Sequence, residues 1–508
     1  MPPLSSDLRR LLEARVVQAR EAAERAASAA LATLAVAEDA PFPDAPPEHV
    51  RLHVALRARA RQLGAGTISA GLPLLGEEIA YVQWHRMLFA RFLADNHLLM
   101  HPAGVPVTLD ECAELAADEG EPDAWQLAAR YAGLMLPGIF RPTDPTALVR
   151  FAPEGRAALE EIIVALPDAV FAADDALGWV YQFWQTKRKQ AVNARGRKIG
   201  GADISPVTQL FTEHYMVQFL LENSLGAWWA ARHPQSPLVQ TFRYLRFRDD
   251  GTPAAGAFPG WPARAAEVTM LDPCCGSGHF LVATFALLRQ MRMEEEGLDE
   301  ATAAEATLRD NIHGLELDPR CTQIAAFALA FAAWKAGGYR VLPALNLACS
   351  GTPVEGQLAD WTALAGADDR LCGALERLYQ LFTHAPDLGS LINPADTPLR
   401  DRMFTADYGE VAPLLAQALV SERHDPAAEV FGAAAEGVAR AARLLANTYT
   451  LVATNVPFLL SRKQDDVLRK FCLQHYQESK NDLSTVFVER CSSFSGYHCT
   501  SAIITPHN

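Results

Sequence analysis

From Val268 onward, short runs rich in leucine and β-branched residues alternate with longer helical segments, and this alternation limits the fold more than any other feature. Parallel strands need long crossover connections, which are usually helices. The pattern therefore predicts an α/β fold with a parallel sheet wrapped by helices. Strands are expected at Val268–Leu271, Ile312–Leu315, Val341–Leu347, Leu451–Ala453 and Ala502–Ile504.

The rest of the chain divides around this region. Residues 1–184 lack strand-like alternation, so we expect a helical N-terminal domain there. Residues 185–204 are strongly basic and contain glycines, which favours a flexible linker. Residues 205–508 form the expected catalytic domain, with a helical insertion at about 352–448 because this stretch is too long for a loop.

Composition restricts the class of protein. The chain has 508 residues, of which 50% are apolar and 21% charged, as in globular proteins with more than one domain. No apolar stretch is long enough to span a membrane, and the N-terminus does not resemble a secretory signal. Nine cysteines without a CxxC pair predict neither disulfides nor a metal site. We expect a cytoplasmic protein.

The net charge of −15 argues against a nucleic-acid partner, because binding to phosphates usually recruits excess Lys and Arg. One short segment, in contrast, is rich in positively charged residues. It can be a solvated linker or a loop that contacts DNA phosphates. Its basic residues are Lys187, Arg188, Lys189, Arg195, Arg197 and Lys198.

A glycine-containing turn follows the first predicted strand and opens a helix, at the edge of the sheet where ligands bind. Small residues let backbone N–H groups approach an anionic group, while Asp272 would attract an ammonium group. This combination suits the methionine end of S-adenosylmethionine; a purely structural turn is the alternative. The candidate cofactor-binding residues are Asp272, Pro273, Gly276, Ser277, Gly278 and Phe280.

The second strand ends in another acid, Glu316. A carboxylate at this place can accept hydrogen bonds from both ribose hydroxyls of a nucleoside, so we assign Glu316 and its neighbour Leu317 to the cofactor. Asp318 can serve the same site or only cap the helix that begins at Pro319.

Three motifs occur in a fixed order: DPCCGSGHFL at 272–281, GLELDP at 314–319 and NVPF at 455–458. They resemble motifs I, II and IV of the amino-methyltransferases that modify adenine in DNA, although Val456 replaces the usual first proline. The resemblance implies a Rossmann-like, S-adenosylmethionine-dependent fold. It also implies that Asn455 and the carbonyl of Val456 accept hydrogen bonds from the adenine amino group, with Pro457 beside them, and that Phe458 stacks on a base flipped out of the duplex.

An upstream segment, TQLFTE at 208–213, resembles motif X of the same enzymes, with Glu213 where proline is common. By this resemblance Thr212 touches the methionine end of the cofactor and Phe211 closes over it. Motif X before motif I is the order of the gamma group, in which target recognition follows the catalytic core.

Weaker similarities point to one group of these methyltransferases. The segments LYQLF at 378–382, GSLI at 389–392 and KNDL at 480–483 resemble the large methyltransferase subunits of BREX and DISARM phage-defence systems. The resemblance implies N6-adenine methylation of double-stranded DNA together with other defence proteins. A final hairpin and a target-recognition domain are expected to be absent. A protein or RNA amino-methyltransferase and an inactive cofactor-binding scaffold remain as alternatives.

Overall fold

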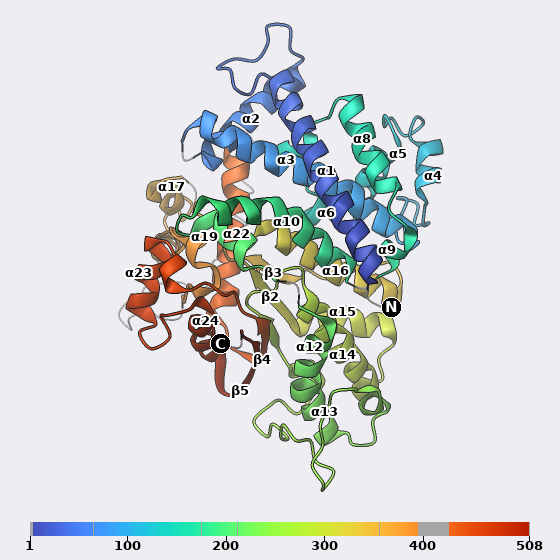
Figure 1. Cartoon of the computed structure of the whole chain (residues 1–508), viewed down its shortest axis with the longest axis vertical. Helices are drawn as coiled ribbons and strands as arrows, with labels where there is room; N and C mark the ends of the chain where they lie inside the picture. The colour runs from blue at the N-terminus through green and yellow to red at the C-terminus, as the bar shows by residue number, and fades with distance from the viewer. Residues whose placement is uncertain are drawn as a thin grey trace. The chain divides into compact units, whose positions relative to one another are not determined.

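The computed structural model describes residues 4–64, 66–173, 175–210, 212–354, 356–394 and 426–506. The chain forms two compact units, Met1–Trp184 and Gln185–Asn508. Figure 1 shows the course of the chain through both units. In the described residues, no helix combines the length and the apolar character needed to cross a membrane.

The first unit is built from helices. The long helix α3 runs through its core and buries Trp84, Phe89 and Phe92. α10 begins in this unit and continues into the next one. The helices are α1 (Ser6–Thr33), α2 (Pro47–Leu63), α3 (Ile68–Asp95), α4 (Leu109–Leu115), α5 (Ala124–Met135), α6 (Pro137–Phe140), α7 (Pro145–Leu148), α8 (Pro153–Val164), α9 (Asp168–Ala172) and α10 (Ala176–Arg195).

The second unit contains a five-stranded sheet with the order β3-β2-β1-β4-β5. All four strand pairs are parallel, as the sequence predicted. The strands are β1 (Met270–Asp272), β2 (Ile312–Glu316), β3 (Asn346–Cys349), β4 (Tyr449–Asn455) and β5 (Ser495–Ile504).

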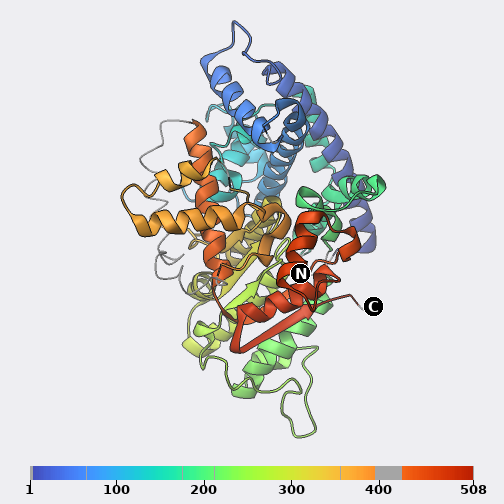
Figure 2. The ribbon, with the colours of Figure 1, turned by 90° about the vertical axis from the view of Figure 1, so that its left-hand side faces the viewer.

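Helices pack against both faces of this sheet, and Figure 2 shows them around the strands. Successive strand residues point to opposite faces: Leu271 and Val452 join one hydrophobic cluster, whereas Met270 and Leu451 join the other. The first cluster includes α18 (Asp369–Phe382), α22 (Pro426–Ala446) and α24 (Leu483–Phe494); the second includes α12 (His214–Leu221), α13 (Ala227–Arg232), α14 (His279–Glu296), α15 (Glu300–Asp310) and α16 (Pro319–Gly337).

The remaining helices of the second unit are short. α11 (Ile204–Thr208) precedes α12, and α23 (Asp466–His475) follows β4. α17 (Leu358–Ala363), α18, α19 (Ala385–Leu388) and α22 occupy the described part of the region where a helical insertion was expected; residues 395–425 of it lie outside the described residues.

Three differences from the prediction exceed two residues. β3 begins at Asn346 instead of Val341, because Pro343 lacks the backbone N–H that strand pairing needs; Val341 is 87% exposed. β5 begins at Ser495, earlier than the predicted Ala502. The prediction of a flexible linker at 185–204 is wrong for its first half, because Lys, Arg, Gln and Ala favour a helix and α10 continues to Arg195.

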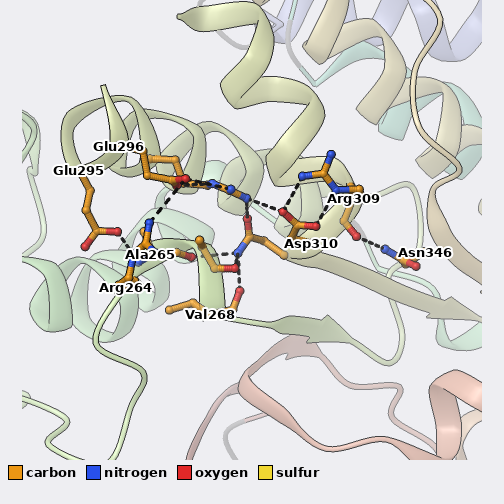
Figure 3. A network of polar contacts seen from close by, with 11 residues as sticks. Arg264, Ala265, Val268, Glu295, Glu296, Arg309, Asp310 and Asn346 are labelled. Carbon is orange, nitrogen blue, oxygen red and sulfur yellow. Dashed lines mark hydrogen bonds and ion pairs between the residues drawn. The ribbon is translucent and has the colours of Figure 1, made fainter. Parts of the chain in front are cut away.

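A buried polar network holds the strands at their amino ends, opposite to the motif-bearing loops (Figure 3). The side-chain amide of Asn311, which directly precedes β2, donates hydrogen bonds to the carbonyls of Ala265 (3.0 Å) and Val268 (2.6 Å) before β1. The buried Arg292 of α14 donates to the Asn311 Oδ1 (3.1 Å) and to Asp310 (3.0 Å). One amide thus ties the starts of two neighbouring strands together.

We expect Asn311→Ala to lower the free energy of unfolding by about 2–4 kcal/mol, because two buried carbonyls and Arg292 are left without this amide as a partner. Asn346→Ala is the matched control, since this half-buried amide donates one bond, to the Arg309 carbonyl (2.9 Å), and accepts a long one from Arg443 (3.4 Å), so its removal should cost about 1 kcal/mol. Chemical denaturation measures both values. An equal effect of the two substitutions would contradict the role of Asn311.

Candidate active site

Three polar side chains end three adjacent strands. Asp272 is the last residue of β1, Glu316 of β2 and Asn455 of β4, and β1 lies between the other two. The strands are parallel, so their carboxyl ends meet at one edge of the sheet. The structure therefore brings together the three residues that the motifs singled out at strand ends.

The turn between β1 and α14 depends on two glycines. Gly276 and Gly278 have φ values of 52° and 91°, in the left-handed region that favours glycine. A Cβ atom on Gly278 would lie 3.1 Å from the Cα of Ala325, so a side chain there would also crowd α16. These glycines allow the chain to reverse closely and begin a helix whose first N–H groups lack intrahelical partners.

The other predicted residues of this turn take different positions. The Ser277 Oγ lies 3.3 Å from the His279 Nδ1, and both side chains are partly buried. Phe280 is buried in a hydrophobic cluster, so it offers its backbone rather than its ring to this edge. The carbonyl of Pro273 accepts a hydrogen bond from the Ser390 hydroxyl (2.6 Å).

Glu316 is held by backbone N–H groups from two loops. Its Oε2 accepts from Gly276 (2.8 Å), and its Oε1 accepts from Asp318 (3.1 Å). Glu316 is only 9% exposed, and this burial raises the pKa of its carboxyl group to about 7 despite these hydrogen bonds. The carboxyl group is thus fixed in place and titrates near neutral pH.

Asp272 is even more buried, with 1% of its surface exposed. Its Oδ1 accepts a hydrogen bond from the backbone N–H of Cys274 (3.1 Å). Burial, with a smaller contribution from the negative charge of Glu316, raises the pKa of Asp272 to about 7 despite the hydrogen bond from Cys274. Two carboxyl groups that disfavour ionisation therefore lie near each other, and a cation or a set of hydroxyl donors placed beside them would stabilise their charged forms.

Asp318 has the role of a helix cap. Its side chain accepts a hydrogen bond from the backbone N–H of Arg320 (2.9 Å) at the start of α16. It also forms an ion pair with the guanidinium group of Arg320 (3.0 Å). Leu317, between the two acids, is half-buried and packs against the first hydrophobic cluster.

Asn455 presents an unsatisfied acceptor. Its Nδ2 donates to the Thr212 hydroxyl (3.1 Å), whereas its buried Oδ1 has no hydrogen-bond partner among the described residues. Val456 is buried and its N–H lies 3.4 Å from the Ile504 carbonyl, while Pro457 and Phe458 are half-buried. A buried oxygen without a donor is costly, and a ligand that supplies an N–H group would remove that cost.

The segment 204–212 crosses this edge of the sheet. Its Ser205 hydroxyl lies 3.4 Å from Asp318 after β2, and its Gln209 Nε2 lies 2.9 Å from the Cys321 Sγ on α16. At its end Thr212 bonds Asn455 after β4. Phe211 lies outside the described residues. The motif X-like segment is therefore attached to both sides of the strand ends.

Sequence reasoning missed a buried polar link behind the two acid-bearing loops. The Ser390 Oγ lies 3.1 Å from the Ser350 Oγ, and the Ser350 N–H donates to the carbonyl of Glu316 (2.7 Å). Arg490 of α24, with 2% exposure, donates to the carbonyls of Ser390 (3.0 Å) and Ile392 (2.8 Å). The similarity at 389–392 was the only sequence signal near this link.

The predicted basic residues lie on a helix and on the segment that follows it. Lys187, Arg188, Lys189 and Arg195 lie on α10. Of these, Arg188 and Arg195 face Asp203 at 3.7 and 4.0 Å. Arg197 and Lys198 lie beyond the helix and are exposed.

We expect Asp272→Asn to stabilise the chain more at pH 8 than at pH 5. The folded pKa is about 7, above the value near 4 of an unfolded Asp, so the free energy of unfolding falls as the pH rises between them. A neutral amide removes this dependence. The control is Asp250→Asn, because hydrogen bonds from Thr252 lower the pKa of that exposed carboxyl and its effect should not change over this range. Denaturation curves test both; a pH-independent effect of Asp272→Asn would contradict the expectation.

Comparison with known proteins agrees with the motifs. The family model of the MmeI DNA-methyltransferase domain matches residues 260–340, which include β1, its glycine turn and Glu316. Two solved structures match nearly the whole chain at 13% identity: a DrdV–DNA complex (95% of this chain and 35% of that one, TM-score 0.38) and the type IIL restriction-modification enzyme MmeI in complex with DNA (97% and 49%, TM-score 0.34).

Two curated relatives match most of the chain. It is 26% identical over 494 residues to the adenine-specific methyltransferase PglX of Lacticaseibacillus casei strain Zhang, covering 86% of this chain and 40% of the relative. It is 27% identical over 485 residues to the adenine-specific methyltransferase BrxX of Escherichia coli O9:H4 strain HS, covering 83% and 39%. The chain thus spans about two fifths of the length of these relatives. Over most of its own length it resembles adenine-specific methyltransferases, which confirms the resemblance that its motifs predicted.

Proposed function

We propose that this chain transfers a methyl group from S-adenosylmethionine to the N6 amino group of an adenine flipped out of double-stranded DNA, as part of a bacterial defence system against phages. The observation that carries the proposal is the buried Oδ1 of Asn455, which has no hydrogen-bond partner in the described part of the chain. It lies at the end of β4, beside the strand ends that carry Asp272 and Glu316. In this interpretation the parallel sheet is a Rossmann-like methyltransferase sheet.

The residues at the ends of β1 and β2 fit this cofactor. Glu316 would accept hydrogen bonds from the ribose hydroxyls, with Leu317 beside the nucleoside, and Asp272 would face the ammonium group of the methionine end. Gly276, Ser277 and Gly278 leave room for that end near the first turn of α14, and Thr212 would approach it from the crossing segment. When bound, S-adenosylmethionine supplies an activated methyl group on a sulfonium.

Asn455 and Val456 would orient the amine. An exocyclic amino group presents two N–H donors, and the Asn455 Oδ1 and the Val456 carbonyl would accept one each. This arrangement aims the nitrogen lone pair and accommodates the positive charge that develops as the amine is methylated. Because the methyl group is already activated, positioning matters more than a strong base. Proline is not needed for a carbonyl acceptor, so Val456 is compatible with this role.

Phe458 would hold the flipped base. An adenine that leaves the duplex loses stacking with its neighbours, and an aromatic side chain compensates part of that loss. Phe458 directly follows Val456 and Pro457 and is half-buried, so part of its ring surface remains available.

Cofactor binding should release protons and weaken at low pH. The pKa values of Asp272 and Glu316 are about 7, and both groups must be ionised to pair with an ammonium group and to accept from hydroxyls. Affinity should therefore rise from about pH 5.5 to pH 7. Calorimetry in two buffers of different ionisation enthalpy measures the protons released. Glu316→Gln should weaken binding and reduce that release. A Kd that is independent of pH, or unchanged in the variant, would argue against this cofactor site.

Asn455→Ala should lower kcat by about 10²–10³-fold, as expected when a transition-state hydrogen-bond partner is removed, while cofactor binding persists. Phe458→Ala should weaken capture of the base by about 1–3 kcal/mol, and Val456→Pro should retain activity. The control is Asn346→Ala at the opposite edge of the same sheet. The assay follows labelled methyl groups into DNA and identifies N6-methyladenine by mass spectrometry. Full activity in Asn455→Ala, or label on cytosine or protein, would refute the assignment.

A further inference from the structure

Three segments that are distant in sequence lie side by side just beyond the candidate catalytic loop. The N–H of Ile199 donates to the carbonyl of Lys463 (2.8 Å), and the N–H of Asp465 donates back to Ile199 (2.9 Å). The N–H of Ser461 donates to the carbonyl of Asn481 (2.9 Å). Backbone pairing thus fixes residues 460–465 between the segment that follows α10 and the segment that precedes α24.

This pairing gathers exposed cations from two parts of the chain. Arg197 and Lys198 come from the first segment, and Arg462 and Lys463 come from the second; all four are exposed. The Lys198 ammonium group also donates to the carbonyl of Arg462, which joins the two pairs directly. We call these four residues the cationic patch.

The side chains of the cationic patch differ from neighbouring basic residues in their ion pairing. In the part of the chain that the structure describes, no ion pair involves any of its four residues, whereas Arg188 and Arg195 nearby face Asp203. The neighbouring acids are engaged elsewhere: Asp465 caps α23 through the N–H of Leu468 (2.9 Å), and Asp466 pairs with Arg469 (3.0 Å). A concentration of free positive charge is notable in a chain whose net charge is −15.

The position of the cationic patch relates it to the candidate catalytic loop. Arg462 is four residues after Phe458, so their Cα atoms are at most about 14 Å apart. The N–H of Leu483 donates to the Leu459 carbonyl (3.1 Å), which anchors the connection between them. Arg462 is therefore close enough to Phe458 for both to contact the same nucleic acid strand.

We propose that the cationic patch binds phosphate groups of the DNA strand that carries the target adenine, and so holds that strand while its base leaves the stack. The inference rests on the proposed function. Phosphate contacts set the register of a protein on DNA without reading sequence, and four exposed cations beside the catalytic loop match the regular negative charge of a strand. The proposal assigns DNA binding to Arg462 and Lys463, which lie outside the basic segment 187–198. Arg188 and Arg195 of that segment instead face Asp203.

The test compares Arg462→Ala/Lys463→Ala with Arg246→Ala/Arg248→Ala, which removes the same charge from exposed positions in another loop. Fluorescence anisotropy with a short labelled duplex gives the affinity at several salt concentrations. We expect the patch variant to bind roughly tenfold more weakly and to reduce the slope of log K against log salt by about 0.9 for each phosphate that is no longer neutralised. Its melting temperature and its affinity for S-adenosylmethionine should be those of the unmodified chain.

The outcomes distinguish the DNA-binding role of the cationic patch from the proposed methyl transfer. Unchanged DNA affinity and salt slope in the patch variant, or an equal decrease in the control, would overturn the cationic patch; capture of an acidic protein by the patch with unchanged DNA affinity would do the same. The chain can fail to bind S-adenosylmethionine or to methylate DNA while the patch variant, unlike the control variant, binds DNA more weakly. In that case the proposed function is wrong, and the assignment of DNA binding to the cationic patch is retained.

Discussion

The hydrogen bond from the Gly276 N–H to the Glu316 carboxylate joins the two loops on which the candidate site depends. The donor, Gly276, has a left-handed backbone conformation that favours glycine. The hydrogen bond also holds a buried acid at a strand end, where water cannot compensate its charge. The turn after β1 and the acid that ends β2 are therefore coupled: a change in the turn would alter the pKa of Glu316, and a change at Glu316 would remove an anchor of the turn.

Buried side chains secure this arrangement at both edges of the sheet. At the amino edge, Asn311 and Arg292 connect the starts of β1 and β2. At the carboxyl edge, Ser350 and Ser390 connect Glu316 with Pro273, and Arg490 holds the Ser390 carbonyl from α24. A short strand such as β1 makes few hydrogen bonds of its own, so these side chains supply much of what positions it.

The sequence predicted the parallel sheet, the turn after β1 and the polar strand ends, because each depends on local patterns: alternation, glycines and an acid at a fixed offset. It could not predict that Ser390 and Arg490 support Glu316, since those interactions join segments about a hundred residues apart. It misplaced β3 because an apolar run containing Pro343 resembles a strand, and it missed the helical half of the basic run because charge suggested a linker. The contact between Lys198 and Arg462 could not be predicted for the same reason, because these residues are also far apart in sequence.

The crossing segment 204–212 has a mechanical consequence. It is attached over the strand ends by the side chains of Ser205, Gln209 and Thr212 and is not a strand of the sheet. Detaching it would break these side-chain interactions and leave every strand pair intact. The described residues of this segment are therefore held at the strand ends independently of the hydrogen bonds that pair the strands.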